Sequence, residues 1–295
     1  MEFMITAGRK GKYLSITRMT CLHKFQRSKV SAVYKMALTT ERCKQIKEYL
    51  VEKILQKLAS YNPETNSMPF HFRLLGKDRM ALFSFIQSVN TTLGTSIFEQ
   101  IGEIIAEPRA MRAIGQYKDF EGFISSEAVL TIDHIMRELR VGTRRPDKEK
   151  ETKEVLAVSS RGNMGKKLRK RVDLLVQMKD GTEYYFEIKT AKPNINEFTG
   201  IKKQMLDWIA MRASENPRAK TKTVVAIPYN PYEPQPYERW TLQGLFDLQE
   251  EVLVGVEFWD LLGGKGTYED LLKVFEEAGI ELHDDIERKM KSVGN

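Results

Sequence analysis

Two strand-like runs joined by a tight turn constrain the fold of this chain more than any other feature. The runs span residues 171–178 and 183–189 of the 295-residue sequence. Asp180-Gly181 between them is a strong hairpin signal, because glycine tolerates the positive φ that a tight turn demands. Apolar residues occupy both faces of each run, as in the central strands of a sheet. We therefore predict a hairpin at the centre of a buried sheet.

Three charged residues interrupt these apolar runs. Asp173 lies in the first run, and Glu187 and Lys189 lie in the second, on the same face because side chains alternate along a strand. The hairpin brings Asp173 opposite them. Such a spacing also occurs by chance in charged sequences whose side chains face water, but burying these charges is costly unless they are paired or bind a metal. Paired carboxylates bind Mg²⁺ beside a phosphate, and a lysine orients or activates the attacking water.

Composition limits the class of protein. A hydrophobic content of 41% is ample for a core, and the length allows one large domain or two small ones. The sequence contains no run of about 18 apolar residues, so it predicts no membrane-spanning helix. Cys21 and Cys43 lack metal-ligand spacing and indicate no disulfide framework, so we expect a cytoplasmic protein.

The net charge of +7 is unevenly distributed. Residues 1–35 contain eight basic residues and one acid, which leaves the remainder neutral. This basic leader lacks the continuous apolar region of a signal peptide. Because residues 36–41 resemble a natural start, we expect residues 1–35 to be a flexible upstream extension. The alternative is a basic arm that grips phosphates.

Apolar periodicity and turn signals predict the remaining elements. In the first half they predict helices over 40–58, 78–89, 95–106 and 125–139. The charged residues 143–153 are expected to form a mobile loop, and 154–159 a strand that opens the sheet. After the hairpin we expect a helix over 197–214, a buried strand over 223–227, a proline-rich loop over 228–236, a candidate strand over 251–257 and a helix over 268–278.

This order of elements predicts an α/β fold with a mixed central sheet flanked by helices, and a helical N-terminal half packed around or beside it. Residues 36–295 are expected to form a single domain. Its mainly helical part covers 36–145, and its sheet core with the C-terminal part covers 146–295.

Basic and polar residues surround the charged hairpin. Five cations lie just before Asp173 in the sequence, where they would flank bound phosphates. A run of charges is more often a solvated face. The five are Lys166, Lys167, Arg169, Lys170 and Arg171. Upstream lie Arg161 and Asn163, whose residue types bond bidentately to guanine and adenine edges. Lys192 follows the hairpin closely enough to contact the DNA backbone.

The Asp173, Glu187 and Lys189 pattern resembles that of the PD-(D/E)xK nuclease superfamily, whose core has the same order of helix, three strands, helix and strand. Val172 replaces the proline of the motif, a widely tolerated departure. Further strings at 186–193, 227–232, 258–264 and 268–272 resemble TdeIII-like type II restriction endonucleases, over about residues 38–290.

The resemblance implies a further acid, as fourth member of the site, on a helix before the sheet. Glu99 lies near the start of an apolar helix and belongs to a Gly…Phe-Glu string. Glu103 lies one turn further along, on the same face of that helix. Glu127 is a third candidate, and an ordinary surface glutamate is the alternative for each. Some superfamily members also place a glutamine near the site at a position like that of Gln204, although a solvent-facing residue is the commoner outcome.

The resemblance also implies a function. It implies Mg²⁺-dependent cleavage of both strands of double-stranded DNA at a short palindromic site of the GGNCC type, with a cognate DNA methyltransferase. A two-fold symmetric site is matched most simply by a homodimer. In such an enzyme Asp173, Glu187 and the carbonyl of Ile188 bind the metal, and Lys189 positions the water.

Besides a soluble structural or interaction protein whose triad is coincidental, two other functions remain open at this level. The first is a different nuclease of the same superfamily, such as a repair exonuclease or a junction resolvase. The second is a non-catalytic DNA-binding protein that keeps the fold, against which the intact Asp173, Glu187 and Lys189 argue.

Overall fold

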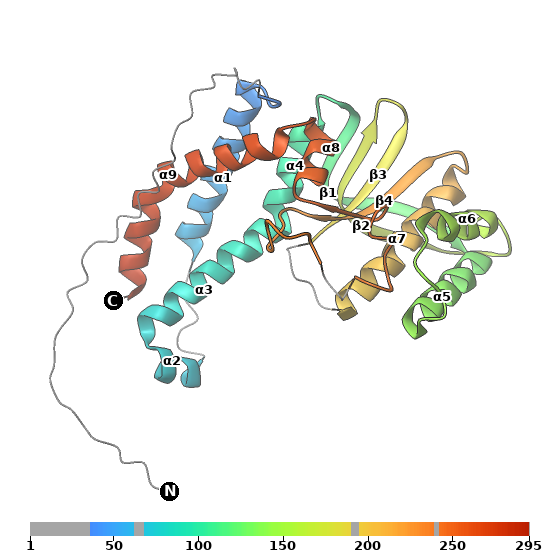
Figure 1. Cartoon of the computed structure of the whole chain (residues 1–295), viewed down its shortest axis with the longest axis horizontal. Coiled ribbons are helices and arrows are strands. Elements are labelled where there is room, and N and C mark those ends of the chain that lie inside the picture. The colour runs from blue at the N-terminus through green and yellow to red at the C-terminus, as the bar shows by residue number, and fades with distance from the viewer. Residues whose placement is uncertain (1–35, 62–67, 190–194, 239–241, 295) are drawn as a thin grey trace, which may run out of the picture. The chain divides into compact units, whose positions relative to one another are not determined.

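The computed structural model describes residues 36–61, 68–189, 195–238 and 242–294. Helices precede, interrupt and follow a single sheet (Figure 1). The helices are α1 (Thr40–Ser60), α2 (Pro69–Leu75), α3 (Lys77–Thr92), α4 (Phe98–Ala106), α5 (Ser126–Val141), α6 (Lys148–Val158), α7 (Ile195–Glu215), α8 (Val256–Gly263) and α9 (Thr267–Gly294). A π-helical turn, Leu93–Ile97, joins α3 to α4. The strands are β1 (Ala110–Ser125), β2 (Met164–Met178), β3 (Thr182–Ile188), β4 (Lys220–Ile227) and β5 (Val252–Val254).

The strands form one mixed sheet in the order β1-β2-β3-β4-β5. β1, β2 and β3 pair antiparallel, whereas β3, β4 and β5 pair parallel. The predicted hairpin is β2–β3, with Leu174 opposite Phe186 and Gly181 at φ +83° in the turn. This arrangement confirms the α/β class and the mixed sheet.

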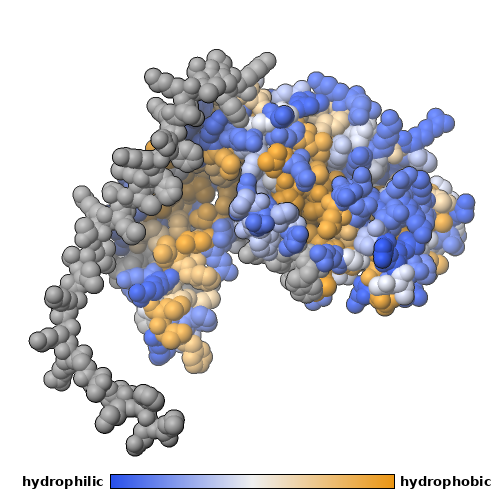
Figure 2. Space-filling model, in the orientation of Figure 1, coloured by the Kyte–Doolittle hydropathy of each residue, from blue (hydrophilic) through white to orange (hydrophobic). Residues whose placement is uncertain are grey.

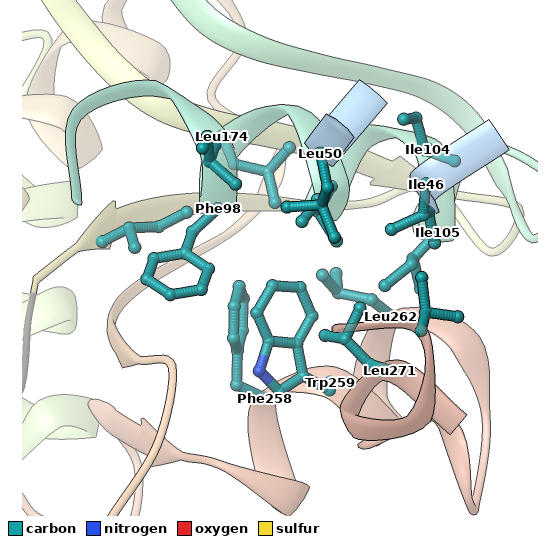
Figure 3. Packing of buried hydrophobic residues seen from close by; sticks show 14 of the residues in the cluster. Ile46, Leu50, Phe98, Ile104, Ile105, Leu174, Phe258, Trp259, Leu262 and Leu271 are labelled. Atoms are coloured by element: carbon teal, nitrogen blue, oxygen red, sulfur yellow. The ribbon is translucent and has the colours of Figure 1, made fainter. Parts of the chain in front are cut away.

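Two hydrophobic cores cover the two faces of the sheet. One lies between the sheet and α1, α4, α8 and α9, where Phe98 and Leu174 pack with Phe258 and Trp259 (Figure 3). The other lies beneath α5, α6 and α7. Figure 1 shows these two groups of helices on opposite sides of the strands. The hairpin is thus buried on both faces, as its apolar sequence predicts.

Two helices begin with a side-chain oxygen that caps the first turn. Thr39 accepts a hydrogen bond from the Arg42 amide at the start of α1, and Ser125 accepts one from the Ala128 amide at the start of α5. Helix α2 was not predicted. It carries exposed apolar side chains, as does α3, and Figure 2 shows this apolar surface. None of the helices in the described part of the chain has the length and apolar character needed to span a membrane.

Two predictions between residues 143 and 159 are wrong. Most of the expected mobile loop, and nearly all of the expected strand after it, form α6. Asp147 caps this helix by accepting from the Lys150 amide at 2.9 Å. Buried Glu151 then contacts Lys202 of α7, with 2.6 Å between the carboxylate and the ammonium nitrogen. Lys202 is distant from Glu151 in the sequence, so no local pattern reveals that this charged segment forms a packed helix.

The strand that opens the sheet is β1, which the sequence pattern does not reveal. β1 lies at the edge of the sheet and mixes exposed and buried residues without regular alternation. Its pairing extends β2 backwards to Met164, so the predicted cations lie within that strand and not before it. The candidate strand over 251–257 is correct only for Val252–Val254. Helix α9 continues well past the predicted end at residue 278.

Candidate active site

Two carboxylates meet where β2 and β3 pair. The pairing of β2 with β3 ends with Leu174 opposite Phe186, and Asp173 and Glu187 are the next residues of the two strands. The two acids are only 6% and 8% exposed. Asp173 Oδ2 accepts a hydrogen bond of 2.9 Å from the amide of Ile188, which ties the first acid to the end of β3.

Lys189 lies just beyond β3, between the two acids. Its Nζ lies 2.8 Å from Glu187 Oε1 and 3.9 Å from Asp173 Oδ2. Burial lowers the pKa of Lys189, but the hydrogen bond and charge of Glu187 outweigh it, so the pKa is raised. Burial, and then the charge of Asp173, raise the pKa of Glu187. Glu187 thus favours the charged form of Lys189, which donates a hydrogen bond to it.

A third acid, Glu99, joins the site from the first turn of α4. Its side chain is 2% exposed, and its Oε1 lies 2.5 Å from Arg171 Nη2. Arg171 also approaches Asp173, with 3.3 Å between Nε and Oδ1, and so bridges two acids. Burial, and then the charge of Asp173, raise the pKa of Glu99 to about 7, against the opposing effect of Arg171. Glu99 Oε2 is buried and has no hydrogen-bond partner within the described ranges.

Gln204 of α7 completes the group. Its Nε2 donates a 2.9 Å hydrogen bond to Glu187 Oε2, so this side chain faces the site and not solvent. A cleft of about 260 Å³ is lined by Gly94, Glu99, Arg171, Asp173, Glu187, Lys189 and Gln204. Four elements (α4, β2, the end of β3 and α7) thus present acids, cations and an amide to one opening.

Comparison with known families decides the class of protein. The model of the HinfI type II restriction endonuclease family matches residues 38–279. The chain belongs to the HinfI type II restriction endonuclease family. It is therefore a site-specific deoxyribonuclease, and its substrate is DNA, as the sequence predicted. The narrower resemblance to TdeIII-like enzymes stays a prediction.

Individual relatives agree with the HinfI-family assignment. The type II restriction enzyme HgiCII of Herpetosiphon aurantiacus is 29% identical over 236 residues, which cover 79% of this chain and 85% of that protein. HgiEI and HgiBI of the same organism are 26% and 25% identical over 277 residues, which cover 86% of this chain and 99% of each relative.

The other predicted acids lie elsewhere in this HinfI-family chain. Glu103 Oε2 accepts a 2.7 Å hydrogen bond from the amide of Gly115, so its carboxylate holds β1 against α4. Glu127 is exposed in the first turn of α5. Neither acid lines the cleft. Among the three candidates, Glu99 alone is there.

The predicted DNA-contacting residues are spread along β2. Lys167 and Arg169 are exposed, whereas Lys170 lies 3.3 Å from Asp207 of α7. Arg161 and Asn163 precede the strand, whose first residue is about 30 Å along β2 from Asp173 at the usual rise per residue. Lys192 and residues 1–35 lie outside the described residues, and the side chain of Lys166 is likewise not described.

Gln116 of β1 was not found from the sequence. Gly115 lies opposite Leu174 and Tyr117 opposite Val172, so Gln116 is beside Asp173. Its φ is +52°, and within the described ranges no other non-glycine residue has a positive φ. Strained backbone of this kind concentrates at functional sites. A lone glutamine in an unrecognised edge strand carries no signal that could have identified it.

The oxygen donors of the cleft determine whether it can hold a divalent metal. Within the described part of the chain, no three His, Cys, Asp or Glu side chains are grouped so as to hold a metal ion. Mg²⁺ needs fewer, because it keeps several waters and uses one or two carboxylates with substrate phosphate. Adjacent Asp173 and Glu187, with the carbonyl of Ile188, supply hard oxygen ligands of this kind. The donors therefore fit Mg²⁺.

Proposed function

We propose that this HinfI-family enzyme cuts both strands of DNA with Mg²⁺ held by Asp173, Glu187 and the carbonyl of Ile188. The observation that carries the proposal is the convergence of Asp173, Glu187 and Lys189 in one cleft. Paired buried carboxylates next to a cation suit a phosphodiester, whose hydrolysis develops negative charge on the phosphate.

Each side chain then has a role. Bound Mg²⁺ would supply Lewis-acid stabilisation of the charge that develops on the phosphate. Lys189 donates a hydrogen bond to the attacking water and is held in place by Glu187. Arg171, now paired with Glu99 and Asp173, turns to a non-bridging phosphate oxygen. Glu99 is the third acid that keeps Arg171 beside the cleft when DNA is absent.

The recognised site and the partners extend the proposal. We infer a short palindromic site of the GGNCC type, a homodimer whose two-fold axis matches that of the site, and a cognate DNA methyltransferase. Arg161, Asn163, Lys167, Arg169, Lys170 and Lys192 are the proposed contacts to DNA outside the cleft. Because the enzyme acts on DNA in the cell, we expect it in the cytoplasm.

Family membership decides against the two alternative functions. HinfI-family members and the related Herpetosiphon proteins are type II restriction enzymes, not exonucleases, resolvases or non-catalytic binders. Among the residues that the structure describes, no observation favours a second function.

The experiment is plasmid digestion by the full-length chain with Mg²⁺, followed by sequencing of the fragment ends. We expect discrete fragments with a common terminal sequence. Asp173→Asn and Lys189→Met should each lower the cleavage rate by about 10³-fold or more, because they remove charge that acts in the transition state. Asp285→Asn, which removes a partly exposed carboxylate on α9, is the matched control.

Three results would contradict parts of this proposal. Intact plasmid in Mg²⁺, with cleavage in another divalent ion, would overturn the choice of metal. Normal cleavage by a folded Asp173→Asn or Lys189→Met variant would overturn the site. Fragment ends without the GGNCC pattern would overturn the recognition sequence alone.

A further inference from the structure

The first half of β2 pairs with β1 alone. β3 pairs with β2 only over Leu174–Gln177, whereas β1 pairs with β2 as far as Met164. Residues 117–125 and 164–172 thus form a two-stranded antiparallel ribbon that extends beyond β3. The ribbon begins beside Asp173, at the candidate active site.

The ribbon has one packed face and one exposed face. Phe120 and Ile124 are buried beneath α5 and α7, and Leu168 packs against the same core. The alternate residues Lys167, Arg169 and Arg171 are all exposed. Because side chains alternate along a strand, these three cations share the face that points away from the core.

The spacing of these cations suits a nucleic-acid backbone. Two residues along a strand advance about 6.8 Å, so Arg171, Arg169 and Lys167 form a row about 14 Å long. The row starts at Arg171, which contacts two acids of the cleft. A DNA strand carries one phosphate per about 3.4 Å of helix axis, so a duplex that enters the cleft offers several phosphates along such a row.

In the free protein, two acids of β1 pair with cations of this row. Asp119 pairs with Arg169, whose Nε also donates to the carbonyl of Lys118 at 3.1 Å. Glu121 pairs with Lys167. The side chains of Asp119 and Arg169 are 68% and 62% exposed. Exposed pairs of this kind contribute little to stability, so a phosphate can replace the carboxylate.

We propose that the exposed face of the ribbon binds the DNA backbone leading away from the cleft, and that Asp119 and Glu121 hold its cations until phosphates displace them. The inference rests on the proposed function, since it assumes that DNA occupies the cleft. It assigns a role to two acids that would otherwise repel the substrate. Such acids lower the affinity for any duplex, because phosphate contacts carry no sequence information.

The test is binding of the full-length chain to two short duplexes with Mg²⁺ omitted. One carries a GGNCC sequence, and the other is a scrambled duplex of the same composition. Asp119→Asn and Glu121→Gln should each tighten binding about threefold to fivefold at low salt, by the same factor for both duplexes. Arg169→Gln should weaken binding and reduce the slope of log affinity against log salt by about one. Asp285→Asn, on α9, should leave both measurements unchanged.

A double variant tests whether Asp119 acts through Arg169. Asp119→Asn should tighten binding much less in the Arg169→Gln background, because the cation that it frees is gone. A full effect in that background, or a factor that differs between the two duplexes, would overturn the inference. So would an unchanged salt slope in Arg169→Gln. If the wild-type chain cuts plasmid normally while these results appear, the inference fails and the proposed function stands.

Discussion

Gln204 of α7 donates a hydrogen bond to Glu187 of β3, with 2.9 Å between Nε2 and Oε2. Along α7, every fourth residue meets every second residue of β3, since Trp208 packs against Tyr185 and Arg212 pairs with Glu183. Four helical residues rise about 6 Å and two strand residues about 6.6 Å, so the two elements stay in step. Helix α7 thereby fixes the orientation of a site carboxylate.

Removal of the Gln204 side-chain amide should slow cleavage without unfolding the protein. Gln204→Ala leaves Glu187 free to rotate, and we expect the cleavage rate to fall about 10-fold to 100-fold, as for other residues that orient metal-binding groups. Gln56→Ala is the control, because Gln56 donates to Glu52 at 2.7 Å on an exposed face of α1. Equal cleavage by both variants would rule out an orienting role for Gln204.

The Arg212–Glu183 pair should make stability depend on pH. Arg212 donates to both oxygens of Glu183 at 2.7 and 2.8 Å, and this hydrogen bonding lowers the pKa of Glu183 below its ordinary 4.5. A pKa that is lower in the folded than in the unfolded protein stabilises the fold at pH values above the unfolded-state pKa. This stabilisation is lost as the pH falls through the folded-state pKa. Arg212→Met should therefore cost about 2–3 kcal/mol near neutral pH, and less at pH values below the folded pKa.

Urea unfolding at neutral and at acidic pH measures this difference. Arg288→Met removes an exposed partner of Asp285 and should cost well under about 1 kcal/mol at either pH. A pH-independent cost for Arg212→Met would show that the loss comes from packing and not from the ion pair.

Lys202 should be the most sensitive buried charge of the fold. Its side chain has no exposed surface, and its Nζ lies 2.5 Å from Glu251 and 2.6 Å from Glu151. Lys202→Met leaves Glu151 unpaired, whereas Glu251 keeps Lys148 at 3.1 Å. We expect a loss of about 3–5 kcal/mol, since an unpaired buried charge is costly.

A second substitution checks the cause of that loss. Lys202→Met combined with Glu151→Met removes both charges and should recover more than half of the lost free energy of unfolding in urea. No recovery in the double variant would mean that the ammonium stabilises the fold through contacts other than Glu151.

The backbone at Gln116 is left-handed, so a glycine variant should be more stable than an alanine variant at this position. This is the reverse of the usual order in a strand. A non-glycine residue at φ +52° carries about 1 kcal/mol of strain, which glycine does not. Gln116→Gly should therefore be more stable than Gln116→Ala by about that amount. At Lys118, a β1 residue without positive φ, glycine should be the less stable of the two. The same order at both positions, measured by thermal unfolding, would contradict the strain.

The catalytic hairpin was predictable because its determinants are local. The Asp180-Gly181 turn sets the register, and the last pair of that register, Leu174 with Phe186, leaves Asp173 and Glu187 next to one another at its end. The caps at Thr39 and Ser125 were equally local, as each side chain bonds an amide three residues away. Glu99 was predicted as a candidate, but only packing of α4 against the sheet separated it from Glu103.

Elements stabilised by distant partners were not predictable. Helix α6 is charged, and its burial depends on Glu151 reaching Lys202, 51 residues later in the sequence. Strand β1 depends on pairing with β2 across α5 and α6, and its own pattern of exposure has no regular period. Neither segment has an apolar periodicity that a window of the sequence could detect.

The sequence by itself determined the β2–β3 hairpin, the opposition of its two acids and the nuclease class that they indicate, because turns and strand alternation act over a few residues. Only the tertiary structure decided which residues join them. Arg171, Glu99, Gln204 and Gln116 come from elements separated by up to about a hundred residues, and their meeting depends on how α4, α7 and β1 pack on the sheet. Packing of that kind is set by the whole buried core, which no local pattern contains.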